Sequence, residues 1–370
     1  MENDGLYIHI PFCKTKCPYC DFYSVTELSL IDPWLDALKK EAAFYKGEYD
    51  VFDSLYLGGG TPSLFGNQQM EDLMNAVLTN VTLARDTEIT IEANPDDITA
   101  DKLEFWRSLG VNRISIGVQS FNDEELLFLK RRHNASVAER AVDLVNASGF
   151  KNYGIDLMYG LPGQTKDSWM KTLEHALTFR PTHLSCYQFT LEERTPYGQL
   201  WAEGKLHLAG ECEEKAFFLL TSSFLKARGF IHYEVSNFAE ARKYESRHNL
   251  KYWQHIPYLG LGPAAHSFKA GMRRWNHRSV EKYCEALSRG EKPVEDAETL
   301  SPEQLRLERL FLGFRTDCGV AVSDLSGKPS FDETISRLRK SRLVKIRNER
   351  IIPTRKGYLI ADHLPLMFRD

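Results

Sequence analysis

The sequence lacks the segments that place a protein in or across a membrane. Its N-terminus has no basic stretch followed by an apolar run, so we expect no signal peptide. No apolar run reaches the roughly 20 residues that cross a bilayer, so we expect no transmembrane segment. The seven cysteines are an odd number without paired spacing, which fits a reducing compartment better than a disulfide framework. Together these features predict a cytoplasmic protein.

An excess of charge of either sign is also missing. The chain has 47 Lys and Arg against 51 Asp and Glu, a net charge of -4, so its overall charge does not point to a nucleic-acid partner. Its 370 residues are 42% hydrophobic and 26% charged, as in an ordinary globular protein with a sizeable core. We find no low-complexity segment and no repeat beyond an alternation of strand-like and helix-like segments.

Three of the cysteines are gathered near the N-terminus. Cys13, Cys17 and Cys20 have the spacing C-x3-C-x2-C. Three thiolates at this spacing can ligate three irons of a cubane and leave the fourth iron open to a small molecule. A structural zinc site usually needs four ligands in two separated pairs, and no second pair follows, although a zinc site that includes His9 remains an alternative, as do unpaired core cysteines. The pattern favours an iron–sulfur cluster.

Strand-like and helix-like segments alternate through the first half of the chain. Such alternation predicts parallel βα units. Chemically reactive or polar residues stand at the end of most of the predicted strands, as they do at the mouth of a barrel. We therefore predict an α/β fold built on a partial (βα)6 barrel. The predicted strands span residues 6–10, 52–57, 88–93, 113–118, 154–159 and 183–189.

The pattern changes after about residue 190. An aromatic and His-rich stretch covers 244–275, and 290–299 has the composition of a charged linker. Two helical patterns, 302–314 and 331–341, then precede a segment, 343–354, that alternates like a hairpin around Asn348-Glu349. These features predict a winged-helix-like α+β domain at the C-terminus. The expected division is a barrel core at 1–200, a barrel extension at 201–290 and the C-terminal domain at 291–370.

A glycine run, Gly58-Gly59-Gly60-Thr61-Pro62, closes the second predicted strand. Glycines let the backbone approach a ligand closely, although a tight strand-to-helix turn would explain them too. Together with the cysteine motif and the aromatic Tyr19 before its last cysteine, this run resembles the radical SAM superfamily. The resemblance implies a [4Fe-4S] cluster and S-adenosylmethionine in a partial (βα)6 barrel. The open iron would chelate the methionyl group, and reduction would release a 5′-deoxyadenosyl radical.

Further motifs resemble the oxygen-independent coproporphyrinogen III oxidase group of that superfamily. They are Tyr7-Ile-His-Ile-Pro-Phe-Cys13, Ile91-Glu-Ala-Asn-Pro95, Ile116-Gly-Val-Gln-Ser-Phe121, Arg131-Arg-His133 and Asp156-Leu-Met-Tyr-Gly-Leu-Pro162. Carboxylates and amides can accept hydrogen bonds from ribose hydroxyls and an ammonium group, and Arg binds a carboxylate as a fork. Taken singly, the charged positions would be assigned to a solvated surface or to buried polar pairs. The resemblance implies contacts with S-adenosylmethionine from Tyr7, Tyr19, Gly59, Gly60, Thr61, Glu92, Gln119, Arg131 and Asp156.

Two departures separate the chain from the oxidase. Phe22 stands where the oxidase pattern has a fourth cysteine, and only 12 residues precede Cys13 where the oxidase has a long segment. The chain resembles instead the haem chaperone branch of the group, the HemW proteins, whose motif occurs as His248-Asn249-x-x-Tyr252-Trp253.

The resemblance implies haem contact through His248, Asn249, Tyr252 and Trp253, with the imidazole as an axial ligand and the aromatics against the macrocycle. The alternative is a loop whose aromatics fill the open side of the barrel, with His248 merely hydrogen-bonded.

We therefore predict a haem chaperone that binds a [4Fe-4S] cluster, S-adenosylmethionine and haem and passes haem to an acceptor protein, such as a membrane-associated respiratory enzyme. The alternative function is the oxidase itself; whether the protein is an enzyme stays open, and no catalytic residue is assigned. A third hypothesis, a winged-helix nucleic-acid binder, rests on a basic C-terminal stretch that would equally suit haem propionates, anionic lipid or an acidic partner. We favour a solvated surface and expect no nucleic acid. The stretch contains Arg337, Arg339, Lys340, Arg342, Lys345, Arg347 and Arg350.

Overall fold

A curved sheet of 12 strands forms the main body of the computed structural model, which describes residues 3–326 and 331–368. The six central strands follow one another in chain order from β1 to β6, and each neighbouring pair is parallel. The elements of this part are β1 (Asp4–Ile10), α1 (Ile31–Phe44), β2 (Phe52–Gly59), α2 (Asn67–Leu78), β3 (Leu83–Ala93), α3 (Ala100–Ser108), β4 (Arg113–Gln119), α4 (Asp123–Phe128), α5 (Ala135–Ala147), β5 (Asn152–Tyr159), α6 (Lys166–Thr178) and β6 (His183–Gln188).

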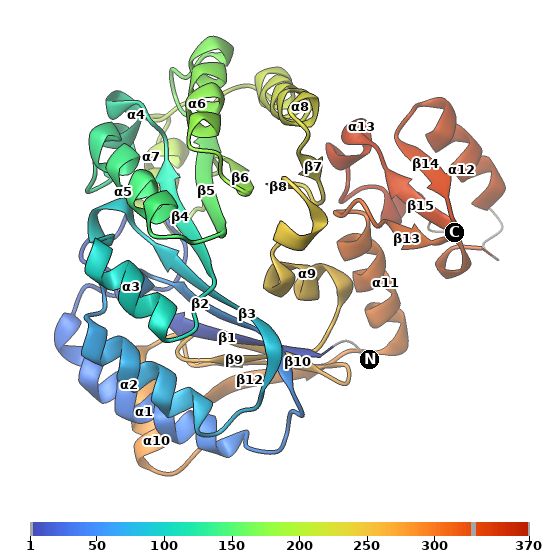
Figure 1. Ribbon diagram of the computed structural model, residues 1–370. Coiled ribbons are helices and arrows are strands. Elements are labelled where there is room, and N and C mark those ends of the chain that lie inside the picture. Colours follow the sequence, from blue (N-terminus) through green and yellow to red (C-terminus); the bar gives the residue numbers. More distant parts are fainter. Residues whose placement is uncertain (1–2, 327–330, 369–370) are drawn as a thin grey trace.

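Helices α1, α2, α3, α5 and α6 lie along the outer side of the curved sheet, as Figure 1 shows. A curved parallel sheet covered by helices on its outer side and open on one flank is a partial barrel. The partial (βα)6 barrel predicted from the sequence is therefore confirmed, although the short helix α4 was not expected.

Alternation within β1 shows how the sequence builds the two faces of this sheet. Leu6, Ile8 and Ile10 are fully buried in the main hydrophobic core. Tyr7 and His9 point to the opposite, concave face, because successive side chains of a strand point to opposite sides. The concave face is thus lined by polar and aromatic groups, which is where a ligand can be held.

Further strands extend the sheet at both edges. The edge beyond β1 continues as β9, β10, β11 and β12, and the edge beyond β6 continues as β8 and β7. Helix α9 lies on the concave side and contacts β1 and β2 (Figure 1). The elements are α7 (Pro196–Ala202), α8 (Glu211–Ala227), β7 (Ile231–His232), β8 (Asn237–Ala239), α9 (Arg247–Gln254), β9 (Tyr258–Leu261), β10 (His266–Lys269), β11 (Met272–Asn276), α10 (Val280–Ser288) and β12 (Val294–Thr299).

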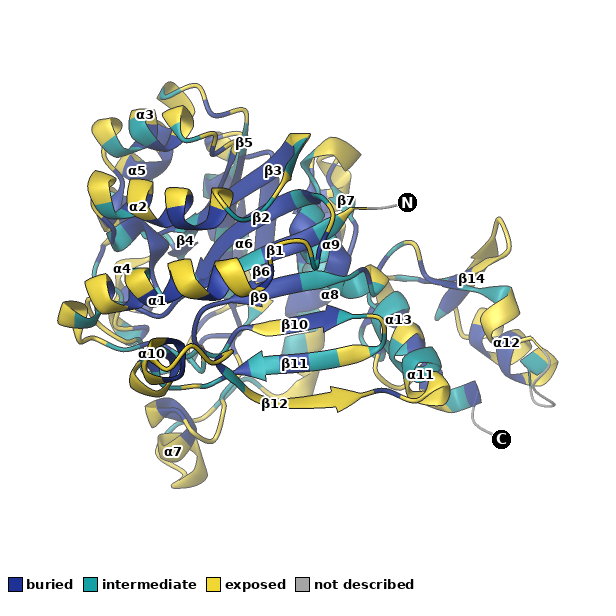
Figure 2. Ribbon diagram, turned by 90° about the horizontal axis from the view of Figure 1, so that it is seen from below, coloured by how far each residue is buried: buried dark blue, intermediate teal, exposed yellow. Residues whose placement is uncertain are grey.

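The expectation of a charged linker at residues 290–299 is wrong. Residues 294–299 are β12, which pairs antiparallel with β11 at the edge of the large sheet. Figure 2 shows β12 exposed along most of its length, whereas the central strands are buried. Charged side chains on an exposed edge strand disfavour pairing with another chain. Among residues 3–326 and 331–368, no helix combines the length and the apolar character needed to cross a bilayer.

The C-terminal part has a small sheet and a hydrophobic core of its own. The predicted hairpin is present, and its turn residues Asn348 and Glu349 have φ of 49° and 57°, as a tight hairpin turn requires. An isolated bridge between Glu234 and Thr316 joins this part to the edge of the large sheet. The elements are α11 (Pro302–Gly313), β13 (Val320–Ala321), α12 (Phe331–Lys340), β14 (Val344–Arg347), β15 (Arg350–Pro353) and α13 (Arg355–Tyr358).

The division of the chain into three domains stays a prediction. Its last boundary, at residue 291, places β12 with the C-terminal part, whereas the strand pairs within the large sheet. Residues 1–2, 327–330 and 369–370 of the predicted ranges lie outside the described residues.

Candidate cofactor-binding site

A cavity of about 610 Å³ opens on the concave side of the sheet. This volume is within the range of sites that enclose a small-molecule ligand. Many of its lining residues stand at the C-terminal ends of β1 to β6, because the ends of neighbouring parallel strands meet at one edge of the sheet. The predicted residues that line it are Cys13, Cys17, Cys20, Tyr19, Gly59, Gly60, Thr61, Glu92, Gln119, Arg131, Asp156 and Asn249. Tyr7, His248, Tyr252 and Trp253 are not among its lining residues.

The cysteine loop after β1 presents its thiols to this cavity. Its start is fixed by the Cys13 amide, which donates to the carbonyl of Val25 at 3.0 Å. The Thr61 hydroxyl donates to Cys13 Sγ at 3.3 Å, and Nη1 of Arg131 lies 3.6 Å from Cys17 Sγ. Hydrogen bonds to sulfur stabilise thiolate ligands and tune iron–sulfur clusters. This set of donors therefore fits a cluster held by three cysteines.

The zinc alternative that includes His9 does not hold in this structure. Both ring nitrogens of His9 are engaged, with Nε2 2.8 Å from the Tyr23 carbonyl and Nδ1 3.0 Å from the Tyr7 hydroxyl. Burial lowers the pKa of His9 to about 4, which keeps the ring neutral at physiological pH. Among the described residues, no group of three or more His, Cys, Asp or Glu side chains is arranged to hold a single metal ion.

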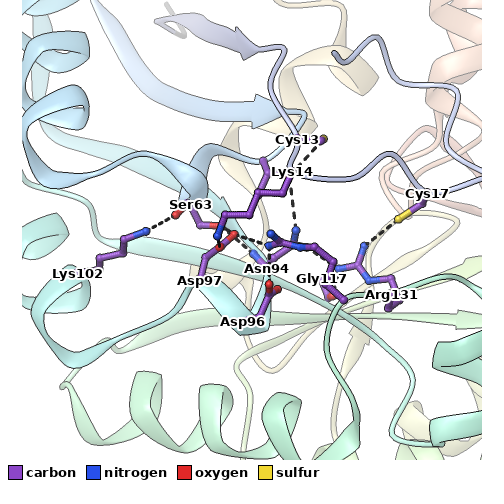
Figure 3. A network of polar contacts seen from close by, with 12 residues as sticks. Cys13, Lys14, Cys17, Ser63, Asn94, Asp96, Asp97, Lys102, Gly117 and Arg131 are labelled. Atoms are coloured by element: carbon purple, nitrogen blue, oxygen red, sulfur yellow. Dashed lines mark hydrogen bonds and ion pairs between the residues drawn. The ribbon is translucent and has the colours of Figure 1, made fainter. Parts of the chain in front are cut away.

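Asn94, at the end of β3, connects the two groups that contact the thiols. Figure 3 shows it between Arg131 and the cysteine loop. Its Oδ1 accepts a 2.5 Å hydrogen bond from Nη2 of Arg131, and its Nδ2 lies 3.5 Å from the Thr61 hydroxyl. One side chain thus positions the donors to both Cys13 and Cys17. Asn94 belongs to one of the motifs noted in the sequence, but no role was predicted for it.

Asp97 ties the cysteine loop to the loops after β2 and β3. It is only 5% exposed and accepts from Lys14 at 3.0 Å, Arg132 at 3.0 Å and the Ser63 hydroxyl at 3.2 Å (Figure 3). Burial alone would raise the pKa of this carboxyl, but the two cations outweigh it and the pKa is lowered. Lys14 stands between the first two cysteines, so this buried carboxylate holds the loop in place.

The glycine run brings backbone to the rim of the cavity. Gly59 has a φ of 108°, a conformation that strains any other residue, and a Cβ on Gly60 would lie 2.6 Å from the carbonyl oxygen of Phe12. The backbone at this rim therefore carries no side chain in the way of a ligand, although the Gly60 amide already donates to the Ile10 carbonyl at 2.8 Å. The Gly59 amide donates to Glu92 at 3.2 Å, which links the run to β3.

Two carboxyl groups on the concave face have perturbed pKa values. Burial raises the pKa of Glu92 to about 7, although the Tyr56 hydroxyl donates to it at 2.8 Å. Burial also raises the pKa of Asp156, whose two oxygens each lie 3.0 Å from the Ser115 hydroxyl. At neutral pH, Glu92 is therefore poised between acceptor and donor, which suits a contact with hydroxyl or ammonium groups.

The His248 motif forms a helix, α9, and not a loop. His248 is 1% exposed, with Nδ1 3.0 Å from the Ser54 hydroxyl and Nε2 2.8 Å from the Tyr252 hydroxyl. Its ring stacks on Tyr56 at a centroid distance of 5.2 Å, and burial lowers its pKa to about 3. Neither ring nitrogen is left for an iron, so the predicted axial-ligand role is not supported. The alternative, a segment that fills the concave side around a hydrogen-bonded His248, agrees with this arrangement.

The rest of the motif is divided between two environments. Asn249 lines the cavity. Trp253 lies instead against Arg315, whose guanidinium carbon is 5.8 Å from the ring centroid. The motif therefore does not present one continuous surface to a macrocycle.

Sequence reasoning missed several cavity residues because most of them come before the C-terminal ends of the strands, where ligand contacts were expected. A signal for them exists in β4, where polar Arg113 and Ser115 alternate with apolar Ile114 and Ile116. That alternation marks a strand with one apolar face and one polar, ligand-facing face. The missed lining residues include Tyr56, Arg113, Ser115, Ser185 and Tyr187.

Comparisons with known proteins agree with this geometry. Residues 7–176 match the family model of the radical SAM superfamily. The chain is 33% identical to a haem chaperone HemW of Bacillus subtilis over 97% of both chains. It is 38% identical to the HemW of Escherichia coli over 71% of this chain and 69% of that one. Among solved structures, coproporphyrinogen III oxidase (HemN) of Escherichia coli has a similar fold, with a TM-score of 0.82, 23% identity and coverage of 99% of this chain and 90% of that one.

Proposed function

The chain belongs to the HemW family within the radical SAM superfamily, and from this membership we propose that it is a haem chaperone. Membership of the superfamily implies a [4Fe-4S] cluster and S-adenosylmethionine. We propose that the chain binds haem in addition and passes it to an acceptor protein. One observation carries the proposal: three cysteines and a glycine run meet at one cavity, in a chain that resembles haem chaperones along 97% of its length.

We propose that Cys13, Cys17 and Cys20 hold the cluster. The backbone carbonyls of Gly59, Gly60 and Thr61 would then hold the methionyl amine, because an ammonium group donates hydrogen bonds and the amides of these residues already donate within the protein. The fit rests on the chemistry of the donors, because three thiols with hydrogen-bond donors at two of them suit a cluster with one open iron. When bound, the two cofactors supply one-electron chemistry; the protein orients them and keeps water away.

The remaining contacts with S-adenosylmethionine are proposed for cavity residues. Glu92 would accept from a ribose hydroxyl, and Tyr19, Gln119, Arg131 and Asp156 would provide further contacts. Tyr7 is different, because it does not line the cavity. Its hydroxyl is hydrogen-bonded to Nδ1 of His9, and its ring stacks against His248. For Tyr7 we therefore propose a supporting role.

We assign the proposed haem contacts by which residues line the cavity, and give less weight to the sequence motif. Asn249 keeps its proposed contact because it lines the cavity. The burial and hydrogen bonds of His248 and Tyr252 favour a scaffolding role for this pair. The haem contact of Trp253 stays a prediction. We propose that the acceptor is a haem protein, membrane-associated respiratory enzymes included, and that transfer takes place in the cytoplasm.

Anaerobic reconstitution tests this function in separate steps. The cluster is rebuilt and followed by its visible absorption, S-adenosylmethionine is added and followed by the change in the cluster's EPR spectrum, and haem is added and followed by its Soret band. The matched control is Cys17→Ser, which should lose the cluster. We expect haem uptake by the wild-type protein and transfer to an apo-haem protein. Failure to take up haem would overturn the proposed haem role. Conversion of coproporphyrinogen to a vinyl product under reducing conditions would overturn it in favour of the oxidase.

A further inference from the structure

Arg113, the first residue of β4, has a buried guanidinium that finds no partner in the part of the chain that the structure describes. The residue is 1% exposed and lines the cavity. Within residues 3–326 and 331–368 its side chain forms no hydrogen bond and no ion pair, and its Nε is enclosed with no acceptor in reach. A buried cation whose donors are unmet is costly, and a protein normally keeps one only where an anion meets it.

Nearby carboxylates balance the charge of Arg113 but do not satisfy its donors. Burial disfavours the charged form, yet acidic neighbours, Glu88 foremost, outweigh it and raise the pKa of Arg113. Each of these carboxylates has another donor. Glu88 accepts from the His248 amide at 3.2 Å, and Asp156 accepts from Ser115. A guanidinium presents five N–H donors in a planar fork, so Arg113 is left ready for an entering carboxylate.

The position of Arg113 separates it from the cysteines. Arg113, Ser115, Gly117 and Gln119 of β4 all line the cavity, with Gln119 at the cysteine end of the strand. The six residue steps from Arg113 to Gln119 span roughly 20 Å of strand. The other cavity arginine, Arg131, lies at the cysteine end and is already engaged with the Gly117 carbonyl at 2.8 Å. The cavity thus has one guanidinium near the thiols and a second, unpartnered one towards its far end.

We propose that Arg113 binds a carboxylate of a cavity ligand, and that this carboxylate is a propionate of haem. The proposal deepens the haem-binding function proposed above and rests on it. The methionyl carboxylate of S-adenosylmethionine is the other possible source, but in the radical SAM arrangement it meets the open iron at the cysteine end. Tyr187 of β6, 40% exposed, lines the same cavity and is an aromatic residue on which a macrocycle can pack.

The test compares haem with haem dimethyl ester, in which both propionates are neutral. Binding of each to the full chain is followed by the Soret band. We expect the wild-type protein to bind the diester at least tenfold more weakly than haem. Arg113→Gln should bind haem about as weakly as the wild-type protein binds the diester and should no longer distinguish the two. Arg113→Lys, which keeps the charge but loses the fork, should fall between them. Arg140→Gln, a change to an exposed cation of α5 on the outer side of the sheet, is the matched control and should behave as wild type.

Each outcome supports or overturns the assignment. Equal affinity of the wild-type protein for haem and diester overturns it, and this comparison needs no variant to fold. An Arg113→Gln protein that still prefers haem over the diester also overturns it, because another cation then binds the propionate. Equilibrium dialysis provides the second arm: loss of S-adenosylmethionine binding with unchanged haem binding assigns the carboxylate to the methionyl group and refutes the propionate. A wild-type protein that binds no haem at all refutes the proposed function, and this inference with it.

Discussion

His248→Phe tests whether His248 is a haem ligand or a residue that stabilises the fold. Phenylalanine keeps an aromatic ring between Tyr56 and Tyr252 but removes both hydrogen bonds of the imidazole. The Ser54 hydroxyl, fully buried, then loses its partner at 3.0 Å. Two neutral hydrogen bonds contribute roughly 1 kcal/mol each, and an unmet buried hydroxyl costs about as much again. We therefore expect the free energy of unfolding to fall by about 3 kcal/mol at pH 7.

The destabilisation caused by His248→Phe should be smaller at acidic pH than at pH 7. Burial lowers the pKa of folded His248 to about 3, whereas in the unfolded chain it has the ordinary value of about 6.5. Between these values only the unfolded wild-type chain binds the proton, so the wild-type protein loses about 1.4 kcal/mol of stability per pH unit. Phenylalanine does not titrate. The difference between the two proteins should fall from about 3 kcal/mol at pH 7 to about 1 kcal/mol at pH 5.

Urea unfolding at pH 7 and pH 5, together with haem titration at pH 7, measures both roles. The matched control is Tyr252→Phe, which removes one hydroxyl and leaves the histidine. Its penalty should be about 1 kcal/mol at either pH. We expect haem affinity within about twofold of wild type for both variants. A His248→Phe protein of unchanged stability that loses the axial-ligand signature of haem would refute the scaffold role and restore the histidine as a ligand.

Three further changes test the cluster loop and the cavity rim. Asp97→Asn should lower the free energy of unfolding, measured in urea, by about 2 kcal/mol and should reduce iron uptake, because Lys14 and Arg132 lose a buried carboxylate. Lys14 contributes little of this energy because its side chain is half exposed. Unchanged iron content would contradict the anchoring role. The wild-type protein should bind S-adenosylmethionine more weakly as the pH falls through about 7, because Glu92 then gains a proton and loses its charge. Glu92→Gln should remove this pH dependence, as equilibrium dialysis at pH 6 and pH 8 would show. Gly60→Ala should cost roughly 2–4 kcal/mol, because its Cβ meets the rigid backbone of Phe12, and normal stability in thermal unfolding would contradict the close contact.

The barrel and the cluster loop were predictable because their signals are local. Each central strand carries apolar residues in a run or in alternation, and most of the strands end in a residue with distinct chemistry. Parallel strands bring these ends to one edge, so Cys13, Gly59, Glu92 and Asp156 were expected together before any contact was known. The cavity lining confirms that they meet.

What escaped prediction depends on partners far along the chain. Helix α9 buries His248 only because Ser54 and Tyr56 of β2 lie opposite it, and no spacing within 248–253 contains that information. Strand β12 escaped for the opposite reason: Glu295 to Thr299 are exposed, so the strand has no apolar alternation to detect. Its pairing with β11 is a property of the sheet edge and not of the segment itself.

Phe22, which stands where the oxidase pattern has a fourth cysteine, is also part of the cavity lining. Its side chain is 67% exposed and lines the same cavity as Tyr187. Large aromatic side chains exposed around one opening are unusual unless a ligand covers them. A cysteine at this position would add a thiol near the cluster, whereas phenylalanine adds an apolar face. An exposed aromatic side chain lining the cavity and the buried guanidinium of Arg113 towards its far end suit a ligand with an apolar face and a carboxylate, which is the chemistry of the haem that we propose as the ligand.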